Sequence, residues 1–268
     1  MTLIMGVVNV TPDSFSDGGR FFSHDDAIEH ARALCREGAD LIDVGGESTR
    51  PGAELVDPVE EQRRVIPVIA ALAAEGISVS VDTMHSSTAS ASVEAGAELI
   101  NDVSGGLVDP DMPRVAAESG RDFVAMHWRG YLTDPHERVH YDDVVSDVHG
   151  ELARRIDALT RAGIAAERLI IDPGLGFSKN PEHNWAILAH LDRFESLAGR
   201  MLVGASRKRF LSTVSPTGAH PAERDPATAA ISMLCAQSGI WAVRVHNVTG
   251  TRTALNVLDA VNAHRDDQ

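Results

Sequence analysis

The residues of this sequence that can do chemistry are mainly carboxylates, amides and cations that lie at or just after the end of a short apolar run. They are Asn9, residues 43–50, Asp82, Asn101, Asp102, His127, Asp172, Ser206, Arg207, Lys208, Arg244 and His246. Carboxylates and amides bind the N–H and carbonyl groups of a flat ring, and cations bind an anion. Taken singly, each residue is also explained as a strand end or a helix cap. If the runs converge, we expect one pocket in which acids and amides form one subsite and cations form another.

The apolar runs are the strands of a predicted barrel. They span residues 3–8, 41–44, 77–81, 98–100, 123–126, 169–171, 201–203 and 242–245, and apolar residues at helical spacing lie between them. Eight strand–helix units in 268 residues suit a (β/α)₈ TIM barrel, whose active site lies at the carboxyl ends of the strands. An open doubly wound sheet is the alternative, but no G-x-G-x-x-G turn follows the first run. We predict an α/β fold with one barrel domain over residues 1–268.

Local signals mark the helix ends of these units. Ser23 with Asp26 is typical of a capping box, and glycines stand at expected helix C-caps at positions 38, 76, 96, 120, 163 and 239. Asp57–Pro58 and Asp225–Pro226 each predict an N-cap followed by the first helical residue. Pro67 lies inside a helical pattern and predicts a kink or a boundary there.

Composition excludes several classes of protein. The sequence has 39 acidic and 24 basic residues, a net charge of −15 that repels nucleic acid and anionic membrane surfaces. Aromatic residues make up 4%, too few for base-stacking platforms. No apolar run is long enough to cross a bilayer, no export signal is visible, and Cys35 and Cys235 fit reduced packing residues. We expect a cytoplasmic protein that binds neither nucleic acid nor membranes.

Four histidines lie along one stretch, at positions 127, 136, 140 and 149. A zinc site is one interpretation, but these spacings match no helical metal pair. Charged residues of a loop surround the histidines, so we interpret them as solvated.

Longer motifs at the strand ends resemble one enzyme family. Residues 5–19 read MGVVNVTPDSFSDGG and resemble the opening signature of the dihydropteroate synthases. The resemblance continues through DVGGESTRPG at 43–52, VDT at 81–83, NDVSGG at 101–106, DPGLGF at 172–177, GASRK at 204–208 and RVHNV at 244–248. It implies a pterin-binding barrel that joins 6-hydroxymethyl-7,8-dihydropterin diphosphate to 4-aminobenzoate. Diphosphate would leave first, and the products are diphosphate and 7,8-dihydropteroate.

The resemblance also implies roles for individual residues. Asp82, Asn101, Asp172 and Lys208 would bind the pterin edges, with Asn101 and Lys208 as donors, and Met126, Phe177 and Gly204 would wall its faces. The diphosphate would be held by Thr49, Arg244 and His246, with Mg²⁺ on Asn9. The aminobenzoate slot would contain Phe15, Thr49, Pro51 and Ser206. The groups with catalytic roles would be Asp17, Arg50, Asp82 and Lys208.

Two other functions stay open at this point. A methyltransferase acting between methyltetrahydrofolate and a corrinoid shares a deep pterin site, but it needs neither a diphosphate grip nor an aminobenzoate slot. A non-catalytic pterin-binding paralogue would have lost loop motifs, and none is missing. Arg209 departs from the family pattern, in which a small hydroxyl residue often follows the lysine. The resemblance further implies a homodimer and competition by sulfonamides that mimic 4-aminobenzoate.

Overall fold

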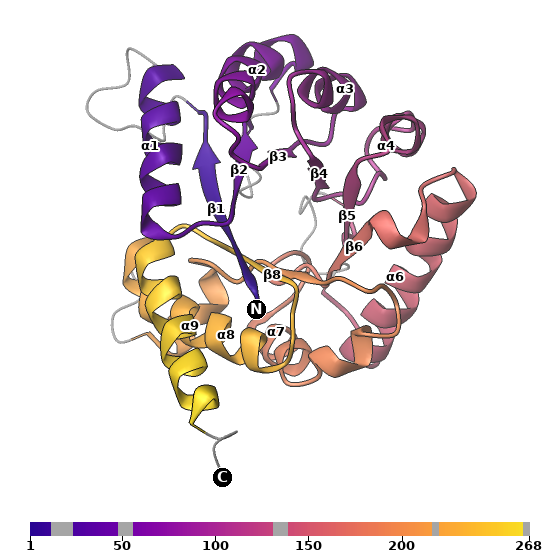
Figure 1. Cartoon of the computed structure of the whole chain (residues 1–268). Coiled ribbons are helices and arrows are strands. Elements are labelled where there is room, and N and C mark those ends of the chain that lie inside the picture. Colours follow the sequence, from indigo (N-terminus) through magenta and orange to yellow (C-terminus); the bar gives the residue numbers. More distant parts are fainter. Residues whose placement is uncertain (12–23, 48–55, 131–138, 216–219, 265–268) are drawn as a thin grey trace.

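A ring of parallel strands forms the centre of the molecule (Figure 1). The computed structural model describes residues 1–11, 24–47, 56–130, 139–215 and 220–264. Its strands are β1 (Leu3–Asn9), β2 (Leu41–Gly45), β3 (Val79–Asp82), β4 (Leu99–Asp102), β5 (Asp122–Met126), β6 (Leu169–Asp172), β7 (Leu202–Val203) and β8 (Ala242–Val245). They pair in the order β6-β5-β4-β3-β2-β1-β8-β7, and a parallel bridge between Ile171 and Met201 joins the two ends of the sheet. The predicted (β/α)₈ barrel is confirmed.

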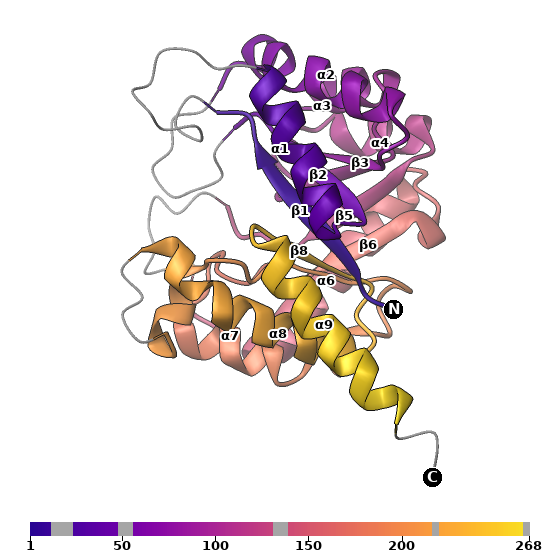
Figure 2. The same ribbon diagram turned by 60° about the vertical axis from the view of Figure 1, so that its left-hand side comes forward.

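Helices surround this ring. They are α1 (His24–Glu37), α2 (Pro58–Ala74), α3 (Ser86–Glu94), α4 (Met112–Ser119), α6 (Val144–Arg161), α7 (Pro181–Leu188), α8 (Asp225–Gln237) and α9 (Val248–Ala263). Short 3₁₀ helices span Ala166–Arg168, Leu191–Phe194, Arg209–Thr213 and Pro221–Arg224. Figure 2 shows α1, α2 and α3 on one side of the strands and α7, α8 and α9 on the other. None of the described helices is both long and apolar enough to cross a membrane.

The two faces of each strand pack against different partners, because side chains alternate along a strand. Outward residues such as Ile42 and Ile100 join the large core beneath the helices. The inward residues that fill the floor of the barrel are Met5, Leu41, Leu99, Val124, Ile170, Leu202 and Ala242. The next inward position is two residues further along, so the floor is followed by a polar layer that contains Asp43, Asn101, Asp172 and Arg244.

Most helix-end predictions agree with the structure. The Asp57 carboxylate caps α2 by accepting from Val59 N, and all the predicted C-cap glycines have positive φ. The helix runs through Pro67, so a boundary there is wrong. Asp225 is the first residue of α8 rather than its cap, and its carboxylate pairs with Arg207 instead. Ser23 lies outside the described residues. Both cysteines are free thiols, Cys235 buried and Cys35 half-buried.

Candidate active site

Arg244 connects the acidic side chains of the polar layer. Its Nε donates to Asp43 Oδ2 at 2.6 Å, and its Nη2 donates to Asp82 Oδ2 at 2.7 Å. The amide of Asn101 also donates to Asp43 Oδ2, at 3.1 Å. Asp43, Asp82 and Asn101 are all buried. The side chains of β2, β3, β4 and β8 therefore form one charged network across the barrel. We expected the acids and the cations to form separate subsites, and this prediction is wrong for Arg244, which is paired with two of the acids.

Asp43 was named among the polar residues of the second strand end, but no role in the site was predicted for it. It is fully buried, and its Oδ1 has no hydrogen-bond partner among the described residues. The signal was present, because Asp43 stands two residues after the inward Leu41. A carboxylate only accepts, so Asn101 must turn its NH₂ group toward Asp43. The amide oxygen of Asn101 takes no part in that bond, so Asn101 offers a ligand an acceptor as well as the predicted donor.

Asp172 and Lys208 meet on the opposite wall. Asp172 Oδ1 accepts from Gly174 N at 2.7 Å, and Lys208 Nζ donates to the carbonyl of Leu175. A Cβ placed on Gly204 would lie 3.7 Å from both Asp172 Oδ2 and Lys208 Nζ and 4.0 Å from Arg244 Cβ. The glycine thus leaves bare backbone beside the Asp172 carboxylate, the Lys208 ammonium and the stem of Arg244, which suits a flat ring lying against it.

Apolar side chains border this polar layer. Met84, Val103 and Met126 form a small buried cluster, and the partly buried Phe177 and Trp128 pack against it. Lys208 Nζ lies 4.6 Å from the centroid of the Phe177 ring, within the range of a cation–π contact. The predicted wall residues Met126 and Phe177 are therefore together. Met84 and Val103 are additions that only the folded loops reveal.

Burial sets the charge of the site. It raises the pKa of Asp82 and of Asp172 and lowers the pKa of Lys208 to about 8. Burial also opposes the charge of Arg244, but Asp43 and Asp82 hold the pKa of Arg244 above its ordinary value. When Asp43, Asp82 and Asp172 are ionised and Lys208 and Arg244 are protonated, three carboxylates face two cations. The layer then carries one net negative charge, which favours a ligand that becomes cationic.

Ser206 and His246 lie in contact, although the resemblance assigns them to different subsites. His246 Nδ1 is 2.9 Å from Ser206 Oγ, and the His246 N–H donates to the same oxygen at 3.1 Å. The two predicted subsites therefore meet here.

The remaining predicted residues lie apart from this contact or outside the described part of the chain. Arg209 is exposed at the start of a 3₁₀ helix. Half-buried Asn9 ends β1 opposite Gly45. Five predicted residues lie outside the described ones, namely Phe15, Asp17, Thr49, Arg50 and Pro51.

The histidine stretch is not a set of solvated residues, as we had interpreted it. His127 is buried at the end of β5, between Glu151 and Lys179. His149 lies on α6 with its ring 6.1 Å from that of Phe194, whereas His140 is exposed. His136 falls outside the described residues. Among those described, no group of three or more His, Cys, Asp or Glu side chains is placed to hold a metal.

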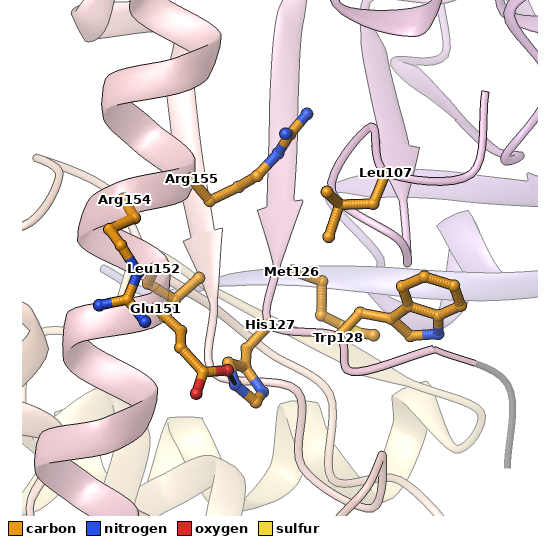
Figure 3. Close-up of a pocket in the computed structure, with 8 residues that line it drawn as sticks. All are labelled: Leu107, Met126, His127, Trp128, Glu151, Leu152, Arg154 and Arg155. Atoms are coloured by element: carbon orange, nitrogen blue, oxygen red, sulfur yellow. Dashed lines mark hydrogen bonds and ion pairs between the residues drawn. The ribbon is translucent and has the colours of Figure 1, made fainter. Parts of the chain in front are cut away.

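A hollow of about 270 Å³ lies beside the polar layer rather than within it. Figure 3 shows Glu151, Leu152, Arg154 and Arg155 of α6 on one side of it and Met126, His127, Trp128 and Leu107 on the other. Met126 and His127 line this hollow and also pair through their backbones with Asp172 of β6. The predicted pterin-edge residues do not line the hollow.

Comparison with known proteins agrees with this geometry. A family model described as pterin binding enzyme matches residues 5–246. A dihydropteroate synthase of Mycobacterium leprae is 48% identical over 263 residues, covering 96% of this chain and 92% of the relative. The chain spans only 30% of one longer bifunctional relative.

Solved structures give the same result. A Xanthomonas albilineans dihydropteroate synthase with 4-aminobenzoic acid has a TM-score of 0.90 and 46% identity, covering 98% of this chain and 93% of that one. A Yersinia pestis dihydropteroate synthase in a sulfonamide drug complex has a TM-score of 0.91 and 38% identity, covering 98% and 94%. The barrel and its polar layer are those of a pterin-binding enzyme. Within that class, the chain belongs to the dihydropteroate synthase family.

Proposed function

We propose that this chain joins 6-hydroxymethyl-7,8-dihydropterin diphosphate to 4-aminobenzoate, giving 7,8-dihydropteroate and diphosphate. The observation that carries this proposal is the convergence of Asp82, Asn101, Asp172 and Lys208 around Arg244 and the bare backbone of Gly204. Family membership supplies the reaction, and the polar layer supplies a physical reason for it.

The polar layer can recognise a pterin through hydrogen bonds. Asp172 has one oxygen bonded to Gly174 N, and its other oxygen faces the space beside Gly204. A carboxylate there accepts N–H groups from the guanidine-like edge of the ring in a charge-assisted pair. Asn101 offers an amide oxygen, and Lys208 offers N–H donors. A ring that leaves these buried groups unpaired loses about 1–3 kcal/mol for each one, which gives selectivity for pterins.

The same charges assist the reaction. When the C–O bond breaks, diphosphate leaves and the pterinylmethyl group becomes a delocalised cation. Asp82 and Asp172 stabilise that cation from fixed positions, without having to reorganise as charge develops. The arylamine nitrogen then forms the new C–N bond and gives up a proton. Arg244, at the centre of the network, and His246, just after the end of β8, attract the leaving diphosphate.

Mg²⁺ is part of this proposal. It prefers oxygen ligands and retains waters, so one protein oxygen with substrate phosphate oxygens suffices. The half-buried amide of Asn9 supplies such an oxygen at the carboxyl end of β1. When bound, Mg²⁺ would neutralise charge on the leaving group. Asn9 alone gives a weak site, so metal binding should depend on the diphosphate.

In this proposal the aminobenzoate slot would be formed by the segments that follow β1 and β2. Phe15, Asp17, Thr49, Arg50 and Pro51 would cover the bound pterin, exclude water and prevent hydrolysis of the cation. The Xanthomonas relative was solved with 4-aminobenzoic acid and the Yersinia relative with a sulfonamide drug. We propose the same ligand classes here, with Ser206 at the edge of the slot. We also propose one domain, a homodimer and a cytoplasmic location.

An assay of diphosphate release tests the reaction against the two alternatives. Release that depends on 4-aminobenzoate and yields dihydropteroate supports a synthase. Pterin binding without product would identify a non-catalytic paralogue. Methyl transfer to a corrinoid without diphosphate release would identify the methyltransferase.

A further inference from the structure

A row of three titratable side chains lies behind the polar layer, with His127 and Lys179 buried and Glu151 half-buried. Glu151 Oε2 on α6 is 2.9 Å from His127 Nε2, and His127 Nδ1 is 2.9 Å from Lys179 Nζ (Figure 3 shows the first pair). His127 is 3% exposed and Lys179 is 9% exposed. The row therefore runs from the outer helix to the loop that follows β6.

The hydrogen-bond partners determine which atoms of Glu151 and His127 carry protons. Glu151 also accepts from Arg129, so its carboxylate is ionised and can only accept. Nε2 of His127 must then carry the proton, which leaves Nδ1 as an acceptor. Burial lowers the pKa of His127 to about 4, which agrees with a neutral ring. Burial likewise lowers the pKa of Lys179 to about 7, and the Asp172 carboxylate opposes that shift.

When Lys179 is protonated, the three N–H donors of its ammonium have three acceptors. Besides His127 Nδ1, they are the carbonyl oxygens of Gly174 at 3.0 Å and of Phe177 at 3.1 Å. These two carbonyls are the first and last of the segment 174–177. A Cβ on Gly174 would lie 2.3 Å from the carbonyl oxygen of His127, so this segment is already pressed against the end of β5. Lys179 therefore holds the segment at both ends.

The held segment positions two of the proposed pterin-binding groups. Gly174 N donates to Asp172 Oδ1 at 2.7 Å, and the carbonyl of Leu175 accepts from Lys208. The Phe177 ring lies 4.6 Å from Lys208 Nζ. Moving the segment would therefore move both Asp172 and Lys208.

We propose that Lys179, oriented by His127 and Glu151, is a positioning residue that sets the geometry of the pterin edge through the segment 174–177. The proposal rests on the proposed function. Lys179 acts through Asp172 and Lys208 and uses all its donors within the protein. Its loss should therefore weaken pterin binding without changing how 4-aminobenzoate is held.

Replacing Lys179 by methionine tests this role, because methionine keeps the length of the side chain and removes its donors. We expect Lys179→Met to raise the dissociation constant for 6-hydroxymethylpterin, measured by calorimetry, by about tenfold or more. The KM for 4-aminobenzoate should stay within about twofold. The matched control is Arg155→Met. Arg155 is a half-buried cation, whereas Lys179 is buried, but it likewise donates to two loop carbonyls, those of Gly105 and Gly106. The backbone N–H groups of these two glycines bond to Asp102, which is not a proposed pterin group. This control should keep pterin affinity within about twofold.

Comparison of two variants of His127 supplies a second, independent measurement. His127→Asn keeps an oxygen acceptor near the position of Nδ1, whereas His127→Leu removes it, so the asparagine variant should bind pterin more tightly. Unchanged pterin affinity in Lys179→Met, or a loss no larger than in Arg155→Met, would overturn the proposal. If Lys179→Met does not fold, equal affinities of the two His127 variants overturn it. Turnover by the unmodified chain tests the proposed function separately.

Discussion

Single residues set the chemistry of the polar layer, and Asp172 occupies its most specific position. One of its oxygens is bonded to Gly174 N, and the other faces the bare backbone of Gly204. One carboxylate oxygen of Asp172 thus bonds to the protein, and the other is left for the ligand. The same division holds for Asn101, whose NH₂ group contacts Asp43. Substitutions that preserve shape and exchange donors for acceptors are therefore the informative ones.

Asp172→Asn should weaken pterin binding by about ten- to a hundredfold. The asparagine oxygen can still accept from Gly174 N, so the loop should keep its shape. Its NH₂ group would then meet the ring N–H groups, which replaces a charge-assisted bond worth about 1.5–3 kcal/mol with a repulsive contact. Calorimetric titration with 6-hydroxymethylpterin measures the change, with thermal unfolding as the control for folding. Intact affinity in a folded variant would reject the assignment.

Asp43→Asn should slow turnover by about tenfold, because the layer loses the negative charge that favours the cation. Arg244 would keep one anionic partner, Asp82, instead of two. Ser80→Ala is the matched control. Ser80 is a buried neighbour of Asp43 in register, and its hydroxyl has no partner among the described residues. Steady-state kinetics with both substrates should separate the two variants. Equal turnover would show that the charge of Asp43 is not used.

Acid should destabilise the fold in part through His127. Its pKa is about 4 in the folded chain and 6.5 as the ordinary value, mainly because of burial and of the charge on Lys179. The unfolded chain then binds more protons between these values, so this contribution is present above pH 6.5 and is lost as pH falls toward 4. Glu151 and Arg129 also face this ring. The difference in unfolding free energy between the unmodified chain and His127→Gln should narrow as urea titrations move from neutral to acidic pH. A constant difference would contradict the buried neutral ring.

The helices and their turns support the strands without contacting the side chains of the polar layer. Gly96 shows this in the turn between α3 and β4. Its φ is +113°, and a Cβ there would lie 2.5 Å from Ala73 Cβ on α2. The glycine was predicted as a helix C-cap, and its close contact with a second helix could not be predicted from local sequence. Pro67 shows the converse, because packing of α2 keeps helical a position that local propensity disfavours.

Gly96→Ala should lower stability by about 1–3 kcal/mol through strain and overpacking. Turnover per folded molecule should be unchanged, because the turn lies away from the polar layer. Gly199→Ala is the control, since a Cβ there meets nothing within 4 Å. Denaturant titration and active-site-normalised kinetics measure both effects. A Gly96→Ala variant as stable as Gly199→Ala would show that the turn can relax.

At the scale of the whole molecule, the strand pattern explains what could be predicted from the sequence, and contacts between distant segments explain most of what could not. The strand positions followed from short apolar runs, and the strand-end residues followed from the barrel rule. The inward position of Asp43 could have been predicted by counting two residues from Leu41. Lys179 gave no such signal, because its burial depends on a loop folding back onto β5. His127 is buried by Glu151, which lies 24 residues further along the chain. Such long-range contacts are invisible to local pattern.

A crystal structure with bound pterin diphosphate tests the central claim most directly. The account predicts the ring against Gly204, with its N–H edge on Asp172 and its other groups near Asn101 and Lys208. The diphosphate should lie toward His246. A ring bound in the neighbouring hollow, between Trp128 and Arg154, would contradict the account.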